Sequence, residues 1–137
     1  MNEPTSPDHY FSAEPASAAE RRQLRVFLAG QELIVETAAG VFCPDRVDIG
    51  TAVLLAHASA PPTTGNLLDP GSGWGPIALT LGLRSPQAST WAVDVNHRAL
   101  ALVRDNAQAL GIHAVPAMTP DAVPAARALA TTRSHPP

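Results

Sequence analysis

The first third of the chain carries two different hydrophobic patterns. Apolar residues alternate with polar or small ones over residues 24–28 and again over residues 33–35, with a Gly-Gln pair between the two runs. Alternation on both sides of a glycine turn predicts a β-hairpin. Residues 48–58 instead place isoleucine, valine and alanine three or four positions apart, which predicts a helix that ends before the prolines of residues 61–64.

Strands and helices are predicted to alternate over the rest of the chain. We expect strands at residues 66–69, 89–94 and 112–117, a helix that begins at Pro76, and a second helix over residues 97–110. This alternation predicts a parallel sheet with right-handed crossovers. We expect a three-layer α/β sandwich centred on the first of these strands. The last strand should lie at an edge, because it contains a proline that cannot donate to a ladder.

A glycine-rich segment joins the first of these strands to its helix. Residues 66–76 read Asn-Leu-Leu-Asp-Pro-Gly-Ser-Gly-Trp-Gly-Pro. A strand that turns sharply into a helix brings backbone N–H groups against a nucleotide-like ligand. A dinucleotide fingerprint would need its last glycine at position 76, which is proline. G-x-G-x-G after L-L-D is instead the pattern of a class I S-adenosylmethionine site, and an ordinary glycine-rich loop is the alternative.

A second acidic residue supports the nucleoside interpretation. Asp94 ends the strand at residues 89–94. It follows the glycines at about 20 residues, the spacing at which a carboxylate reaches ribose hydroxyls. Buried strands often end in aspartate, but a glycine loop followed by an acidic strand end is much harder to obtain by chance.

The chain resembles the small-domain methyltransferases related to the bacterial 16S rRNA guanine-N2-methyltransferases. The resemblance rests on His-Tyr-Phe-Ser at residues 9–12, Gly-Val-Phe at 40–42, Val-Asp-Ile-Gly-Thr at 47–51, residues 67–81, Trp-Ala-Val-Asp-Val-Asn at 91–96, Arg-Ala-Leu at 98–100 and Asn-Ala at 106–107. It implies a Rossmann-like class I methyltransferase sandwich with an N-terminal β-hairpin packed at the rim near the cofactor mouth. It also implies S-adenosyl-L-methionine as cofactor, and ribosomal RNA or the small ribosomal subunit as partner.

The resemblance assigns the amino-acid end and the ribose of the cofactor to the glycine loop. The backbone around Gly71, Ser72 and Gly73 should approach both parts, because only residues without bulk permit that contact. Asp69 should orient the methionine ammonium, directly or through water.

The other cofactor contacts are expected beyond the second strand. Asp94 should accept hydrogen bonds from both ribose hydroxyls, and Val95 should flank the adenine. Asp121 is a candidate for the adenine amine, with an ordinary turn acid as the alternative.

The end of the chain departs from the family pattern. The family carries Asn-Pro-Pro, whose first two carbonyls accept the N–H bonds of an exocyclic amine and so orient its lone pair. The resemblance puts His135 and Pro136 at these positions, and a neutral imidazole accepts one hydrogen bond whereas a protonated one only donates. The strand before them, residues 128–132, is weak, and the family's later strands are absent. We therefore interpret the chain as C-terminally incomplete, with weak methyl transfer or none.

Several functions stay open at this point. The first is an S-adenosylmethionine-dependent methyltransferase that acts on a guanine exocyclic amine of ribosomal RNA. The others are an inactive cofactor-binding fragment or pseudo-enzyme, a relative of the protein glutamine methyltransferases, and an NAD-binding module. Pro76 counts against the NAD module. The hairpin and the Gly-Val-Phe and Asp-x-Gly-Thr segments favour the RNA branch over the glutamine branch.

Composition limits the kinds of ligand site and the cellular location that we expect. The 137 residues are 45% hydrophobic and carry a formal net charge of −3, which does not suggest an electrostatic nucleic-acid binder. One cysteine and five histidines without ligand spacing predict no metal site. A polar N-terminus and the lack of an apolar run of ~20 residues predict a cytoplasmic protein without a membrane span. We expect a flexible arm over residues 1–20, a hairpin extension over 21–47 and a partial S-adenosylmethionine-binding domain over 48–137.

Overall fold

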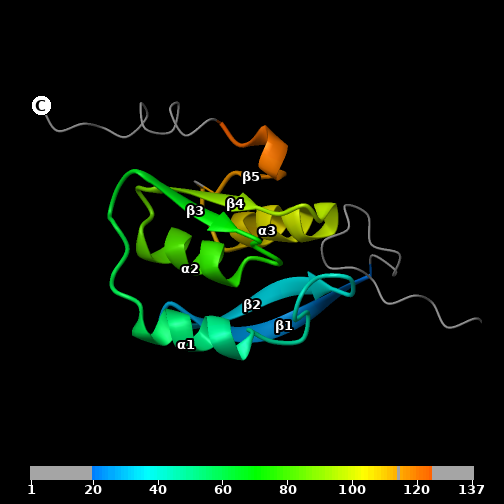
Figure 1. The fold of residues 1–137 in the computed structure, drawn as a ribbon. Helices are drawn as coiled ribbons and strands as arrows, with labels where there is room; N and C mark the ends of the chain where they lie inside the picture. The colour runs from blue at the N-terminus through cyan, green and yellow to red at the C-terminus, as the bar shows by residue number, and fades with distance from the viewer. Residues whose placement is uncertain (1–19, 114, 125–137) are drawn as a thin grey trace, which may run out of the picture.

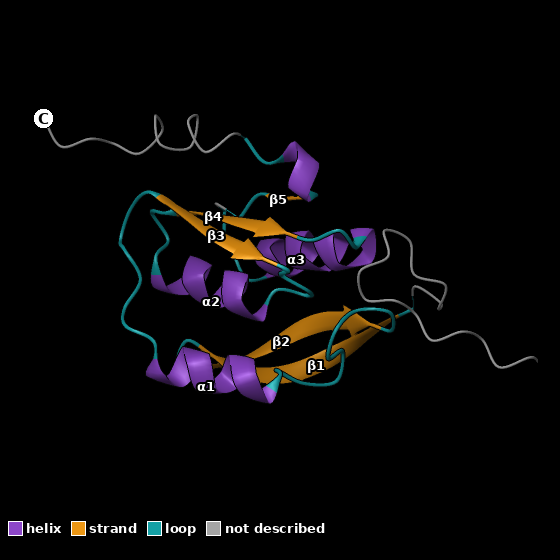
Figure 2. Ribbon diagram, in the orientation of Figure 1, coloured by secondary structure: helices purple, strands orange, loops and turns teal. Residues whose placement is uncertain are grey.

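The computed structural model describes residues 20–113 and 115–124, which form three stacked layers (Figure 1). In chain order the elements are β1 (Arg21–Leu28), β2 (Gln31–Ala38), α1 (Ile49–His57), β3 (Asn66–Pro70), α2 (Pro76–Arg84), β4 (Ser89–Val93), α3 (His97–Ala109), β5 (Ala117–Met118) and the 3₁₀ helix η1 (Pro120–Ala122). Helices α2 and α3 lie between the sheet of β3, β4 and β5 and a layer made of β1, β2 and α1 (Figure 2). The predicted arm over residues 1–20 falls outside the described residues except for Glu20.

The predicted hairpin is confirmed. Strands β1 and β2 pair antiparallel from Arg21 opposite Ala38 to Leu28 opposite Gln31. The turn is Ala29–Gly30, one residue earlier than the Gly-Gln pair in the sequence suggests. Both turn residues have positive φ, 51° and 75°, because a two-residue turn must match the right-handed twist of its strands.

The hairpin packs on the helices, whereas we expected it at the rim of the sheet. Its inner residues Val26, Leu28 and Val35 are buried in one apolar cluster that also contains Leu79 of α2 and Val103 of α3. The strand pattern makes this face apolar, and the helices offer the apolar surface that it needs. The loop that follows β2, residues 39–48, reaches the glycine loop, where the indole N–H of Trp74 donates to the carbonyl of Cys43.

The parallel sheet has the order β3-β4-β5. Strand β4 is therefore central among the described residues, and the expectation that β3 lies at the centre is not met there. Strand β5 pairs only with β4 in the described part, as predicted for an edge strand, but it is shorter than predicted. The strand begins after Pro116, which has no N–H to donate. The carbonyl of Pro116 still accepts the N–H of Ala92 at 2.9 Å.

The helices form where the sequence predicts them. Asn96 caps α3 by accepting the N–H of Ala99 at 3.1 Å, and Gly111 follows the helix with φ 72°. Helix α2 begins at Pro76, where no backbone donor is needed. In the described part these helices cover one face of the parallel sheet. Leu68 on the other face is 54% exposed.

Candidate cofactor site

The loop between β3 and α2 holds three glycines in a conformation that other residues avoid. Gly71, Gly73 and Gly75 have φ of 68°, 58° and 108°. A Cβ atom on Gly71 or Gly73 would meet nothing within 4 Å, whereas one on Gly75 would lie 3.0 Å from Cγ2 of Val103. The first two glycines therefore leave open space beside the loop, and the third permits close packing of the loop against α3.

The position of the loop is set by backbone contacts with the neighbouring strand. The N–H of Ser72 donates to the carbonyl of Val93 at 3.0 Å, and the N–H of Gly75 donates back to the carbonyl of Ser72 at 3.1 Å. Ser72 is buried, and its hydroxyl lies 3.5 Å from the carbonyl of Gly73. The contact of its backbone with a cofactor stays a prediction.

Asp69 lies at the carboxyl end of β3 and is only 4% exposed. Its Oδ2 accepts the N–H of Ala78 in the first turn of α2 at 3.1 Å. Burial raises the pKa of Asp69 to about 6; the N–H of Ala78 opposes this change and the charge of Asp94 adds to it. The carboxylate therefore supports the start of α2 and has limited contact with solvent.

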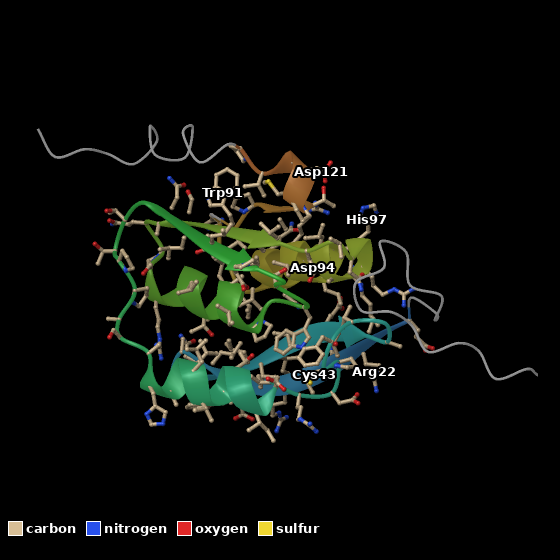
Figure 3. All side chains as sticks on the ribbon, in the orientation of Figure 1. Arg22, Cys43, Trp91, Asp94, His97 and Asp121 are labelled. Carbon is tan, nitrogen blue, oxygen red and sulfur yellow. The ribbon has the colours of Figure 1, made fainter. Side chains whose placement is uncertain are left out.

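Asp94 follows β4 at the same edge of the sheet, as predicted. It is 9% exposed; its Oδ2 accepts the N–H of Gly73 and its Oδ1 accepts the N–H of Asn96, both at 2.9 Å. Each carboxylate oxygen keeps a further lone pair, so the side chain can still accept from two hydroxyls. Val95 beside it is exposed. Figure 3 shows Asp94 at the strand ends and Cys43 on the side of the hairpin.

Asp121 lies on η1 and is fully exposed to solvent. A hydrogen bond from the Thr119 side chain lowers its pKa below the usual range, and its own backbone N–H and the nearby His97 act in the same direction. Asp121 does not line the pocket at the glycine loop. Its contact with an adenine amine stays a prediction, and the turn acid that the sequence offered as the alternative fits this position.

A pocket opens beside the glycine loop, and its second wall was not predicted. Phe42, Cys43, Asp48 and Thr51 line it opposite the residues of the loop. The indole N–H of Trp74 donates to the carbonyl of Cys43 at 3.1 Å and so fastens this wall to the loop. In the sequence these segments carry the family resemblance and the start of the helix predicted over residues 48–58, and none of them was predicted to line the site. The available signal was Asp48 three residues before Thr51, the spacing of a helix cap.

The predicted amine-binding residues, His135 and Pro136, lie outside the described residues. Within residues 20–113 and 115–124, no three histidine, cysteine or acidic side chains gather in a way that could hold a metal ion. The helices of the same residues are all too short or too polar to cross a membrane.

Fold and site together define an α/β protein with a glycine-rich loop and two buried carboxylates at the carboxyl edge of a parallel sheet. The model of the methyltransferase small domain family matches residues 32–132. The chain therefore belongs to the methyltransferase small domain family, which confirms the family that the sequence predicts.

Similar proteins agree with this assignment. YbxB of Bacillus subtilis, which has no assigned function in its name, is 30% identical over 133 residues, covering 95% of this chain and 66% of YbxB. Ribosomal RNA small subunit methyltransferase C of Stutzerimonas stutzeri is 37% identical over 126 residues, covering 91% of this chain and 37% of that protein. The chain thus spans two thirds or less of the length of these relatives.

A solved structure shows the same fold. The T. thermophilus 16S rRNA methyltransferase RsmC, in complex with AdoMet and guanosine, superposes with a TM-score of 0.61 at 21% identity. The match covers 70% of this chain and 26% of that chain. The predicted Rossmann-like methyltransferase fold with an N-terminal hairpin is therefore confirmed.

Proposed function

We propose that this protein is an S-adenosylmethionine-dependent methyltransferase whose cofactor binds at the glycine loop. The observation that carries the proposal is the open space beside Gly71 and Gly73, where Asp69 lines the pocket and Asp94 accepts the N–H of Gly73. A ligand can contact the backbone there, and the carboxylates favour hydroxyl and ammonium groups over phosphates. The RsmC structure, which holds AdoMet, supports the same cofactor.

The residues present fit the cofactor. The backbone of Gly71, Ser72 and Gly73 would contact its amino-acid end and ribose. Asp94 would accept from the ribose hydroxyls through its free lone pairs, and Val95 offers an exposed apolar surface for the adenine. Asp69 would contribute a negative charge for the ammonium. When bound, S-adenosylmethionine supplies an electrophilic methyl group on a sulfonium.

We further propose a guanine exocyclic amine of ribosomal RNA as the methyl acceptor, in free RNA or in the small ribosomal subunit. The names of the relatives support this substrate. The new bond would join the methyl carbon to the amine nitrogen while the carbon–sulfur bond breaks, with S-adenosylhomocysteine as the leaving group, and the methylated amine would release one proton to water. His135 and Pro136 would hold the amine, and we expect slow transfer because an imidazole replaces a side-chain carbonyl acceptor there.

Transfer of a radiolabelled methyl group to small ribosomal subunits tests this function. We expect slow incorporation with the 137-residue chain and an increase of at least several-fold with His135→Asn, since asparagine restores a side-chain carbonyl acceptor. The assay should be run beside protein substrates and deproteinised rRNA. No incorporation with either protein, together with tight cofactor binding, would indicate an inactive cofactor-binding protein.

A further inference from the structure

The wall of the pocket opposite the glycine loop carries an acid that the cofactor contacts proposed so far do not use. Asp48 is half-buried at the start of α1 and lines the pocket together with Cys43 and Thr51. Two hydrogen bonds hold this wall in place. The indole N–H of Trp74 donates to the carbonyl of Cys43, and the side-chain amide of Asn96 donates to the carbonyl of Gly40 at 2.7 Å. Asp48 is therefore held at a fixed place opposite the loop.

Asp48 is less buried than Asp69 and Asp94, and both of its hydrogen-bond contacts are weak. Its Oδ2 accepts the N–H of Thr51 at 3.3 Å, and the thiol of Cys43 lies 3.8 Å from its Oδ1. The first contact is long and the second involves a weak donor. Asp69 and Asp94 are more deeply buried and accept backbone N–H groups at 2.9–3.1 Å.

The local sequence leaves room for this carboxylate. A Cβ atom on Gly50 would lie 3.1 Å from Oδ2 of Asp48, closer than ordinary contacts. No described arginine or histidine forms an ion pair with Asp48. Its charge is thus directed at the pocket without a basic partner from the described part of the chain.

We propose that Asp48 is a specificity-determining residue that accepts the ammonium of the cofactor's amino-acid end. This inference rests on the proposed function, because it takes S-adenosylmethionine as the ligand. An ammonium has three donors and no acceptor, so it needs an acid with free lone pairs. Asp48 meets this need from the wall of the pocket, whereas Asp69, which lines the same pocket, is only 4% exposed and has one oxygen on the N–H of Ala78. The same charge disfavours ligands with a pyrophosphate.

The affinities of two probes separate this role from a general effect on the pocket. S-adenosylhomocysteine carries the amino-acid end, and 5′-methylthioadenosine lacks it. Asp48→Asn keeps an acceptor for the N–H of Thr51, and asparagine caps helices well. Asp45→Asn is the matched control, because Asp45 lies on the same loop but is exposed and pairs with Arg22 at 2.7 Å.

Calorimetric titration of the full chain should show a loss of at least tenfold in affinity for S-adenosylhomocysteine in Asp48→Asn, with 5′-methylthioadenosine unaffected. Asp45→Asn should bind both probes as the wild type does. Unchanged affinity for both probes in Asp48→Asn, or an equal loss for both, would overturn the role of Asp48 and leave the proposed function intact. If the wild-type chain binds neither probe, the proposed function fails and this inference fails with it.

Discussion

At the scale of single residues, burial of the charged Asp69 carboxylate lowers the stability of the folded chain. Its carboxylate is buried, and its pKa is about 6 against an ordinary value of 3.8. The folded state therefore binds the proton more tightly than the unfolded state. Stability falls as the pH rises from about 4 to about 6, and the cost is fully present above that range.

The substitution Asp69→Asn should remove this cost. At pH 8 we expect the variant to be more stable than the wild type by about 3 kcal/mol, since one pKa unit corresponds to roughly 1.4 kcal/mol. Below pH 4 the difference should vanish, because the wild-type carboxyl is then protonated. Urea unfolding of both proteins at several pH values measures it, and parallel stability profiles would contradict this account of Asp69.

Sequence patterns identified the residues of the glycine loop and the two strand-end acids because neighbours along the chain define them. A glycine turn after a strand is a local signal, and parallel strands bring their carboxyl ends to one edge. Asp48 and Cys43 could not be found in this way. They meet the loop only because the hairpin packs on α2 and α3, and that contact joins segments far apart in sequence.

At the scale of elements, one buried side chain joins the hairpin to α3. Asn106 accepts the N–H of Glu36 at 2.7 Å and donates to the carbonyl of Glu36 at 2.9 Å. Its amide also lies 3.4 Å from the carbonyl of Trp74 in the glycine loop. A single asparagine thus connects β2, α3 and the loop.

The substitution Asn106→Ala should destabilise the chain by about 2–3 kcal/mol, because it leaves backbone groups of β2 without a partner. Chemical unfolding measures this loss. Gln108→Ala changes an exposed residue of the same helix and should shift stability by less than about 0.5 kcal/mol. Equal effects of the two substitutions would show that Asn106 does not hold the hairpin.

The elements themselves were largely predictable, and their packing was not. The period of 3.6 residues located α1 and α3 to within a residue, the alternating runs located the hairpin to within three residues, and Pro76 marked the start of α2. Strand β5 came out shorter because Pro116 delays its ladder. The apolar inner face of β1 and β2 predicts that this face is buried. The sequence pattern does not show that α2 and α3 are the elements that cover it.

At the scale of the whole molecule, the hairpin, the helices and the parallel sheet share one apolar cluster. The cluster fixes the loop after β2 against the glycine loop, and the pocket forms between them. The pocket is thus lined by two segments of the chain, within residues 42–51 and 69–77. The resemblance indicated the family and its cofactor from short motifs, whereas the second wall required the three-dimensional structure.

The most direct test of the central claim is calorimetric titration of the full chain with S-adenosylhomocysteine and, in parallel, with NAD. We predict saturable binding of S-adenosylhomocysteine at one site and much weaker binding of NAD, because Asp48 and Asp69 line the pocket and disfavour a pyrophosphate. In Asp94→Ala the affinity for S-adenosylhomocysteine should fall by 1.5–3 kcal/mol, roughly 10- to 100-fold, as expected for hydrogen bonds to a charged group. Preference for NAD, or the same affinity with and without Asp94, would contradict a methyltransferase cofactor site at the glycine loop.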